Sequence, residues 1–155
     1  MKNENLLKEF LLQNCLKLEK ALESYKKSIL KCQKIELGSI LNFNDSEAFD
    51  SLSSKFGRIS DIYIQKILRT IFILFREEAK HIVDLANKAE KFEIIDNADT
   101  LIMIRDIRNQ ITHEYEDENL VKLYQEILQL SEPLIINIEN TINFIRTTDI
   151  LQPKH

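Results

Sequence analysis

Apolar side chains recur along the chain at alternating spacings of three and four residues, the pattern of helices that bury one face. The first such stripe predicts one long helix over residues 3–34, formed by Leu11, Cys15, Leu18, Leu22, Tyr25, Ile29 and Cys32. Both cysteines belong to the stripe. We therefore expect them to be small buried hydrophobic side chains rather than redox groups or ligands.

A second helix is expected after a polar loop over residues 35–46. Asp45 or Ser46 can cap its N-terminus, because short polar side chains accept hydrogen bonds from the free backbone N–H groups there. The helix should run to about Lys80 and be loosened near Gly57, since glycine disfavours a helix interior.

Three further helical stretches complete the pattern. One ends near Phe92, and the next is capped by one of three polar residues, Asp96, Asn97 or Asp99. The last helix begins in the acidic turn 116–118, and Pro133 should kink or divide it. The sequence predicts an all-α fold, an antiparallel bundle of four to five helices. We expect one domain over 1–150 and a short C-terminal tail over 151–155.

The chain of 155 residues contains only two glycines, Gly38 and Gly57, and two prolines. Gly-rich phosphate-binding loops need several glycines close together, so nucleotide-binding folds built on such loops are excluded. Tight hairpins also consume glycine, which makes a sheet-rich fold improbable.

The net charge is −4, which argues against nucleic-acid binding through bulk charge but leaves room for a local basic groove. Two cysteines are too few for a disulfide framework or a Cys-rich zinc site, and we expect neither a metal nor another cofactor. The N-terminus lacks a secretory signal pattern, and the apolar runs are too short to span a membrane. The expected location is therefore cytoplasmic.

A cluster of cations is expected on one face of the second helix. At 100° per residue, and if the helix is continuous, six cations share an arc of about 80°: Lys55, Arg58, Lys66, Arg69, Arg76 and Lys80. Such an arc can hold a phosphate backbone without recognising bases, or it can simply be a solvated polar face. Ile62 and Ile73 lie in the same arc, which suggests that another subunit covers part of it.

The stretch from Arg105 to Tyr115 concentrates chemically active side chains. Arg108 lies on an apolar stripe, so its guanidinium needs a buried partner or a cleft. His113 lies about 140° from Arg108 on an ideal helix. Either the helix ends or bends between them, or a pocket forms from two copies of the chain. The plain alternative is a structural ion pair of Arg108 with Asp106 or Glu114, and an ordinary helix-end histidine.

Arg, Asn, His and Tyr close together suit phosphodiester chemistry. Histidine can transfer a proton near neutral pH, and arginine can stabilise the charge that develops on a phosphoryl group. Arg108, Asn109, His113 and Tyr115 resemble the Arg-x4-His-x-Tyr motif of HepT-type toxins, within the HEPN family of helical ribonucleases. Asn directly after Arg is the usual polar neighbour in that family.

The resemblance implies a metal-independent endoribonuclease that acts as a homodimer on RNA, with Arg108, Asn109 and His113 in the catalytic site. It also implies a partner, a minimal nucleotidyltransferase antitoxin that transfers AMP to Tyr115. A second family with a similar Arg-Asn…His-x-Tyr element implies instead a non-catalytic substrate-binding subunit of a nucleotidyltransferase. A helical scaffold that only self-associates is the third interpretation.

Overall fold

The computed structural model describes residues 2–38, 40–113 and 117–151, and every regular element in these ranges is helical. The all-α prediction is therefore confirmed. The elements are α1 (Lys2–Gln33), α2 (Phe43–Asp61), the π-helix η1 (Ile62–Leu68), α3 (Arg69–Leu74), α4 (Ile82–Lys91), α5 (Ala98–Thr112), α6 (Asp117–Thr147) and the short 3₁₀-helix η2 (Asp149–Leu151).

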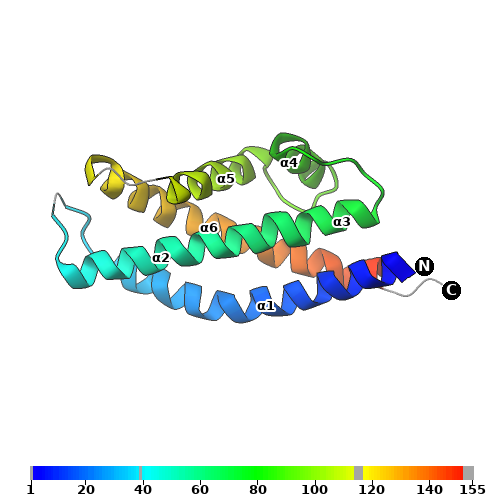
Figure 1. The fold of residues 1–155 in the computed structure, drawn as a ribbon, viewed down its shortest axis with the longest axis horizontal. Helices are drawn as coiled ribbons and strands as arrows, with labels where there is room; N and C mark the ends of the chain where they lie inside the picture. Colours follow the sequence, from blue (N-terminus) through cyan, green and yellow to red (C-terminus); the bar gives the residue numbers. More distant parts are fainter. Residues whose placement is uncertain (1, 39, 114–116, 152–155) are drawn as a thin grey trace.

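Three long helical rods lie side by side along the molecule (Figure 1). They are α1, the continuous rod formed by α2, η1 and α3, and α6. Helix α5 packs on the α2 and α6 side, and the short α4 packs against α5. Successive long elements run in alternating directions, so that the start of α1 and the end of α6 lie at the same end of the bundle (Figure 1). This arrangement is a helical bundle, as predicted.

The predicted stripe of the first helix is buried at every position from Leu11 to Cys32. Burial raises the pKa of the Cys15 thiol to about 11, and it also raises the pKa of Cys32. The Cys32 thiol donates to the carbonyl of Ala48 at 3.4 Å. Thiols that stay protonated are weak nucleophiles, so both cysteines behave as packing residues.

The second helix differs from its prediction at its start and its end. Its cap is Asn42 rather than Asp45 or Ser46, since the Asn42 Oδ1 accepts the backbone N–H of Asp45 at 2.8 Å. The rod ends at Leu74, and Arg76 follows with a positive φ of 59°. Lys80 therefore lies beyond the helix that was expected to carry it.

The predicted loosening near Gly57 is also wrong in position. Gly57 lies inside the regular helix α2, where an added Cβ would make only an ordinary contact with Ile111 Cγ2 at 3.9 Å. The irregular part is η1, which begins five residues later and closes with the Arg69 N–H donating to the Ile64 carbonyl. This π-helix changes the angular positions of all later residues on the rod.

The later helices follow the predicted order. The cap of α5 is Asn97, whose side chain accepts the N–H groups of Asp99 at 2.7 Å and Thr100 at 3.3 Å. Pro133 lies inside α6 without dividing it. No helix in the described part of the chain is long and apolar enough to cross a lipid bilayer.

We expect Asn42→Ala to lower the free energy of unfolding by about 1 kcal/mol, because the first turn of α2 loses its side-chain acceptor. Urea unfolding followed by circular dichroism measures this loss. Ser46→Ala is the matched control and should change stability by less than about 0.5 kcal/mol. A larger loss for Ser46→Ala than for Asn42→Ala would contradict the assignment of the cap.

Candidate functional site

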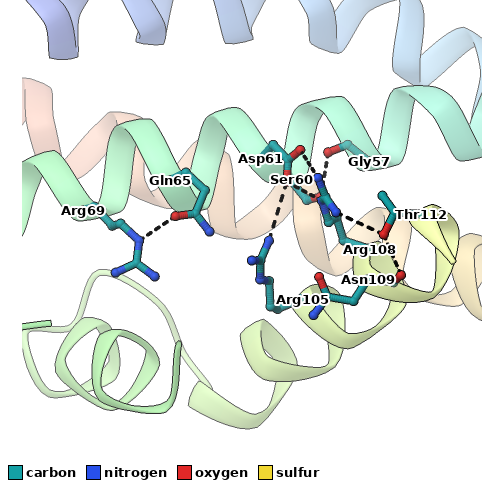
Figure 2. Close-up of polar contacts among 9 residues, drawn as sticks. All are labelled: Gly57, Ser60, Asp61, Gln65, Arg69, Arg105, Arg108, Asn109 and Thr112. Atoms are coloured by element: carbon teal, nitrogen blue, oxygen red, sulfur yellow. Dashed lines mark hydrogen bonds and ion pairs between the residues drawn. The ribbon is translucent and has the colours of Figure 1, made fainter. Parts of the chain in front are cut away.

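Helix α5 presents two arginines to the rod. Its buried side chains Leu101, Ile104 and Ile107 fix its orientation against the bundle. Arg105 and Arg108 lie one turn apart and both extend toward the end of α2 (Figure 2). The apolar packing of α5 therefore brings both guanidinium groups to the same point of the rod.

Asp61, the last residue of α2, is the partner of Arg108. Its Oδ1 accepts Arg108 Nε at 2.5 Å, and its Oδ2 accepts Arg108 Nη2 at 2.7 Å. This hydrogen-bonded pair raises the pKa of Arg108 above its ordinary value. Two parallel bonds to one carboxylate fix the plane of the guanidinium. In the described part of the chain the remaining nitrogen, Nη1, makes only a long contact of 3.4 Å with the Thr112 hydroxyl.

Arg105 lies near the same carboxylate. Its Nη1 lies 3.7 Å from Asp61 Oδ1, which is ion-pair distance but too long for a hydrogen bond. Within residues 2–38, 40–113 and 117–151, Asp61 is the one carboxylate at ion-pair distance from either arginine. The single negative charge of Asp61 is thus shared by the positive charges of Arg105 and Arg108.

A third arginine, Arg69, lies further along the rod (Figure 2). Its Nε donates to Gln65 Oε1 at 2.6 Å, and its Nη1 donates to the carbonyls of Ala79 at 2.7 Å and Lys80 at 2.8 Å. Burial lowers the pKa of Arg69, and the nearby charge of Arg105 lowers it further. We call Arg69, Arg105 and Arg108 the arginine row.

Helix α5 ends between Arg108 and His113, one of the alternatives that the sequence leaves open. Thr112 is the last helical residue, and His113 has an extended backbone with φ −95° and ψ 135°. The Asn109 carbonyl accepts the Thr112 hydroxyl at 2.8 Å and the His113 N–H at 3.3 Å. Because the chain leaves the helix here, the 140° separation expected on a straight helix does not apply to His113. The imidazole is exposed.

The suggested ion pair of Arg108 with Asp106 is wrong: Asp61, 47 residues away in sequence, is the partner. Glu114 and Tyr115 lie outside the described residues.

The cations of the predicted arc are distributed over different surfaces. Lys55 donates to the Ser28 hydroxyl at 2.6 Å and lines a hollow of about 600 Å³ between α1 and α2. Arg58 and Lys66 are exposed on the rod, whereas Arg76 and Lys80 follow its end. The premise of a continuous helix to Lys80 is therefore wrong. Ile62 is buried by its own chain rather than left for another subunit, and Ile73 is exposed.

Sequence reasoning missed Asp61 and Arg105. A weak signal for Asp61 is the spacing of four that joins Gly57, Asp61, Gln65 and Arg69 along one line of a helix. Arg105 lies three positions before Arg108, which predicts a shared face but not a shared partner. The pairing itself joins residues far apart in sequence, so only the fold reveals it.

No group of three or more His, Cys, Asp or Glu side chains in the described ranges could hold a metal ion. Comparisons of the chain with protein-family models, curated protein sequences and solved structures gave no match. A functional assignment therefore depends on the residues and geometry of this chain.

A double-mutant cycle with Asp61→Asn and Arg108→Gln should give a coupling free energy of about 1 kcal/mol, since the pair is bidentate and half-buried. Urea unfolding of the four proteins measures it. The exposed pair Arg146–Glu19, at 2.7 Å, provides the control and should couple by about 0.3 kcal/mol. Equal coupling in the two cycles would show that Asp61 does not fix Arg108.

Proposed function

We propose that this protein is a metal-independent endoribonuclease of the HepT type, the toxin of a cytoplasmic toxin–antitoxin pair. The observation that supports it best is the end of α5 directly before His113. It leaves an exposed imidazole beyond the last turn, while Asp61 fixes Arg108 in that turn. A proton-transferring group and an anchored cation within six residues suit cleavage of a phosphodiester.

In the proposed reaction, His113 accepts the proton of a ribose 2′-hydroxyl. The 2′-oxygen then attacks the adjacent phosphorus, and the bond from phosphorus to the 5′-oxygen breaks. The products are a 2′,3′-cyclic phosphate and a 5′-hydroxyl end, whose oxygen takes up a proton. Arg108 stabilises the charge that develops on the phosphoryl oxygens, through the Nη1 group that Asp61 leaves available. Asn109 supports the bound substrate.

The proposed active form is a homodimer in which the two motifs face each other across one cleft. Its proposed partner is a minimal nucleotidyltransferase that attaches AMP to Tyr115. An anionic nucleotide two residues from His113 would repel RNA and obstruct the cleft. Neutralisation would then depend on charge and bulk at the site rather than on unfolding.

One observation favours the alternative of a non-catalytic, substrate-binding subunit of a nucleotidyltransferase. Arg108 uses two of its three guanidinium nitrogens on Asp61, as a purely structural arginine would. In that case Arg108 fixes α5 on the rod, and the protein presents a substrate to a separate enzyme.

Purified protein should cleave single-stranded RNA in the presence of EDTA. His113→Ala and Arg108→Ala should each lower the cleavage rate by at least about 100-fold, because one removes the proton acceptor and the other the charge stabilisation. Gel analysis of end-labelled RNA measures the rate, and circular dichroism verifies the fold. Arg146→Ala, which removes an exposed arginine of the α1–α6 pair, is the matched control.

Cleavage at the wild-type rate in both variants would refute the catalytic assignment. If the wild-type protein cleaves no RNA yet forms a tight complex with a nucleotidyltransferase, the subunit alternative is correct. A protein that dimerises but binds neither RNA nor nucleotidyltransferase would be the scaffold.

Incubation with ATP and a cognate nucleotidyltransferase should add one AMP to the wild-type chain and none to Tyr115→Phe. Intact-mass spectrometry detects the adduct. The modified protein should lose RNA cleavage, whereas Tyr115→Phe should stay active after the same treatment. Addition of AMP to Tyr115→Phe would place the modification at another residue.

A further inference from the structure

Arg105 differs from the other two arginines of the row because none of its donors is hydrogen-bonded to a described residue. Its guanidinium makes no hydrogen bond to any residue in the described ranges, and its one charged contact, to Asp61 Oδ1, is 3.7 Å long. Its side chain is nevertheless only 27% exposed. A half-buried guanidinium without hydrogen bonds lacks compensation for its lost hydration, and an anionic ligand would supply it.

The row as a whole carries excess positive charge. Within the described ranges Asp61 is the one carboxylate at ion-pair distance from the row, and it contacts Arg105 and Arg108 but not Arg69, which leaves two positive charges in excess in a protein of net charge −4. Burial is the main cause of the lowered pKa of Arg69, and the positive charge of Arg105 lowers it further. The second contribution is a repulsion between these two cations. Binding of an anion between them would relieve that repulsion.

We propose that Arg105 binds a backbone phosphate of a single-stranded RNA, flanked by Arg69 and Arg108, so that the row leads the strand to His113. This inference rests on the proposed function, because it takes RNA as the ligand. The groups available for phosphate are the guanidinium of Arg105 and Nη1 of Arg108, both on the same face of α5 (Figure 2). Contacts to phosphates carry no information about the bases, so binding should depend little on sequence.

A polymer fits the row better than a small phosphate ion does. The three side chains lie in the order Arg69, Arg105, Arg108 along the direction of the rod (Figure 2). Gln65 lies beside Arg69, and Asp61 lies beside Arg105 and Arg108. Consecutive phosphates of one strand can contact Arg105 and Arg108 in turn, while the charge of Arg69 attracts the strand further along the rod. The row ends at Arg108, about one turn before the end of α5, and His113 directly follows that helix in the chain.

The test uses the full chain and a short fluorescein-labelled 2′-O-methyl RNA, which lacks the free 2′-hydroxyl and cannot be cleaved by the proposed reaction. Fluorescence anisotropy at several KCl concentrations gives the affinity and its salt dependence. Arg105→Gln should weaken binding about ten-fold and reduce the log–log salt slope by about 0.7, the loss of one phosphate contact. The control Arg146→Gln removes the same charge from the α1–α6 pair and should leave the slope nearly unchanged.

A second variant should change the RNA affinity in the opposite direction. Asp61→Asn removes the carboxylate that neutralises Arg105 and Arg108, so the uncleavable RNA should bind more tightly by about three-fold, while RNA cleavage slows because Arg108 is no longer fixed. A purely structural role of the ion pair predicts no gain in affinity. Unchanged or weaker binding by folded Asp61→Asn would overturn the proposal.

The two proposals can fail separately. If Arg105→Gln has the same RNA affinity and salt slope as Arg146→Gln while His113→Ala abolishes cleavage, the phosphate-binding proposal is wrong and the ribonuclease proposal is supported. If the wild-type protein cleaves no RNA but Arg105→Gln has a lower RNA affinity and a smaller salt slope, the arginine row is a phosphate-binding surface without catalysis. Inorganic phosphate should displace the RNA only at far higher concentration. Displacement at an equal concentration of phosphate groups would overturn the polymer as ligand.

Discussion

A guanidinium group on an apolar helix face must find an acceptor, and this constraint determines how α5 lies on the rod. Arg108 follows the buried residues Leu101 and Ile104, so packing α5 against the bundle carries the charge inward with them. The Asp61 carboxylate accepts two hydrogen bonds from the Arg108 guanidinium. Apolar burial supplies most of the free energy of this packing, whereas the ion pair selects the register, because Asp61 is the one carboxylate in the described ranges at ion-pair distance from Arg108.

The rod is buried on several sides at the π-helix that directly follows Asp61. Ile62, Tyr63 and Ile64 are three consecutive buried residues, which a helix covered on one face alone cannot provide. The Tyr63 hydroxyl is hydrogen-bonded to Thr141 Oγ1 at 2.7 Å, which ties η1 to α6. The rod is therefore covered by α1, α6 and α5 near its middle. Asp61 lies at the junction where the regular helix gives way to the wider one.

The fold was largely predictable, because each helix carries its own apolar stripe and that signal is local. The stripe from Leu11 to Cys32 and the Asn97 region at the start of α5 needed no knowledge of the rest of the chain. The errors concern features that depend on neighbours. The π-helix departs from the regular helical repeat, so angular positions calculated at 100° per residue misplace the cations beyond Ile62. Asp61 was missed because a residue 47 positions from Arg108 becomes its partner only after folding.

The scarcity of glycine and the position of Asp61 both bear on the proposed binding of phosphate. A chain with two distant glycines offers no backbone cradle, so side chains must provide the donors. Arginine side chains are flexible, and a flexible donor loses entropy when it binds. Asp61 removes that cost for Arg108 by holding it before any ligand arrives, but it also cancels part of the attraction. Arg105, whose guanidinium makes no hydrogen bond within the described part of the chain, would compensate for that cancelled charge in the proposed site. One carboxylate shared by two arginines would therefore suit an anion better than an isolated, fully neutralised pair.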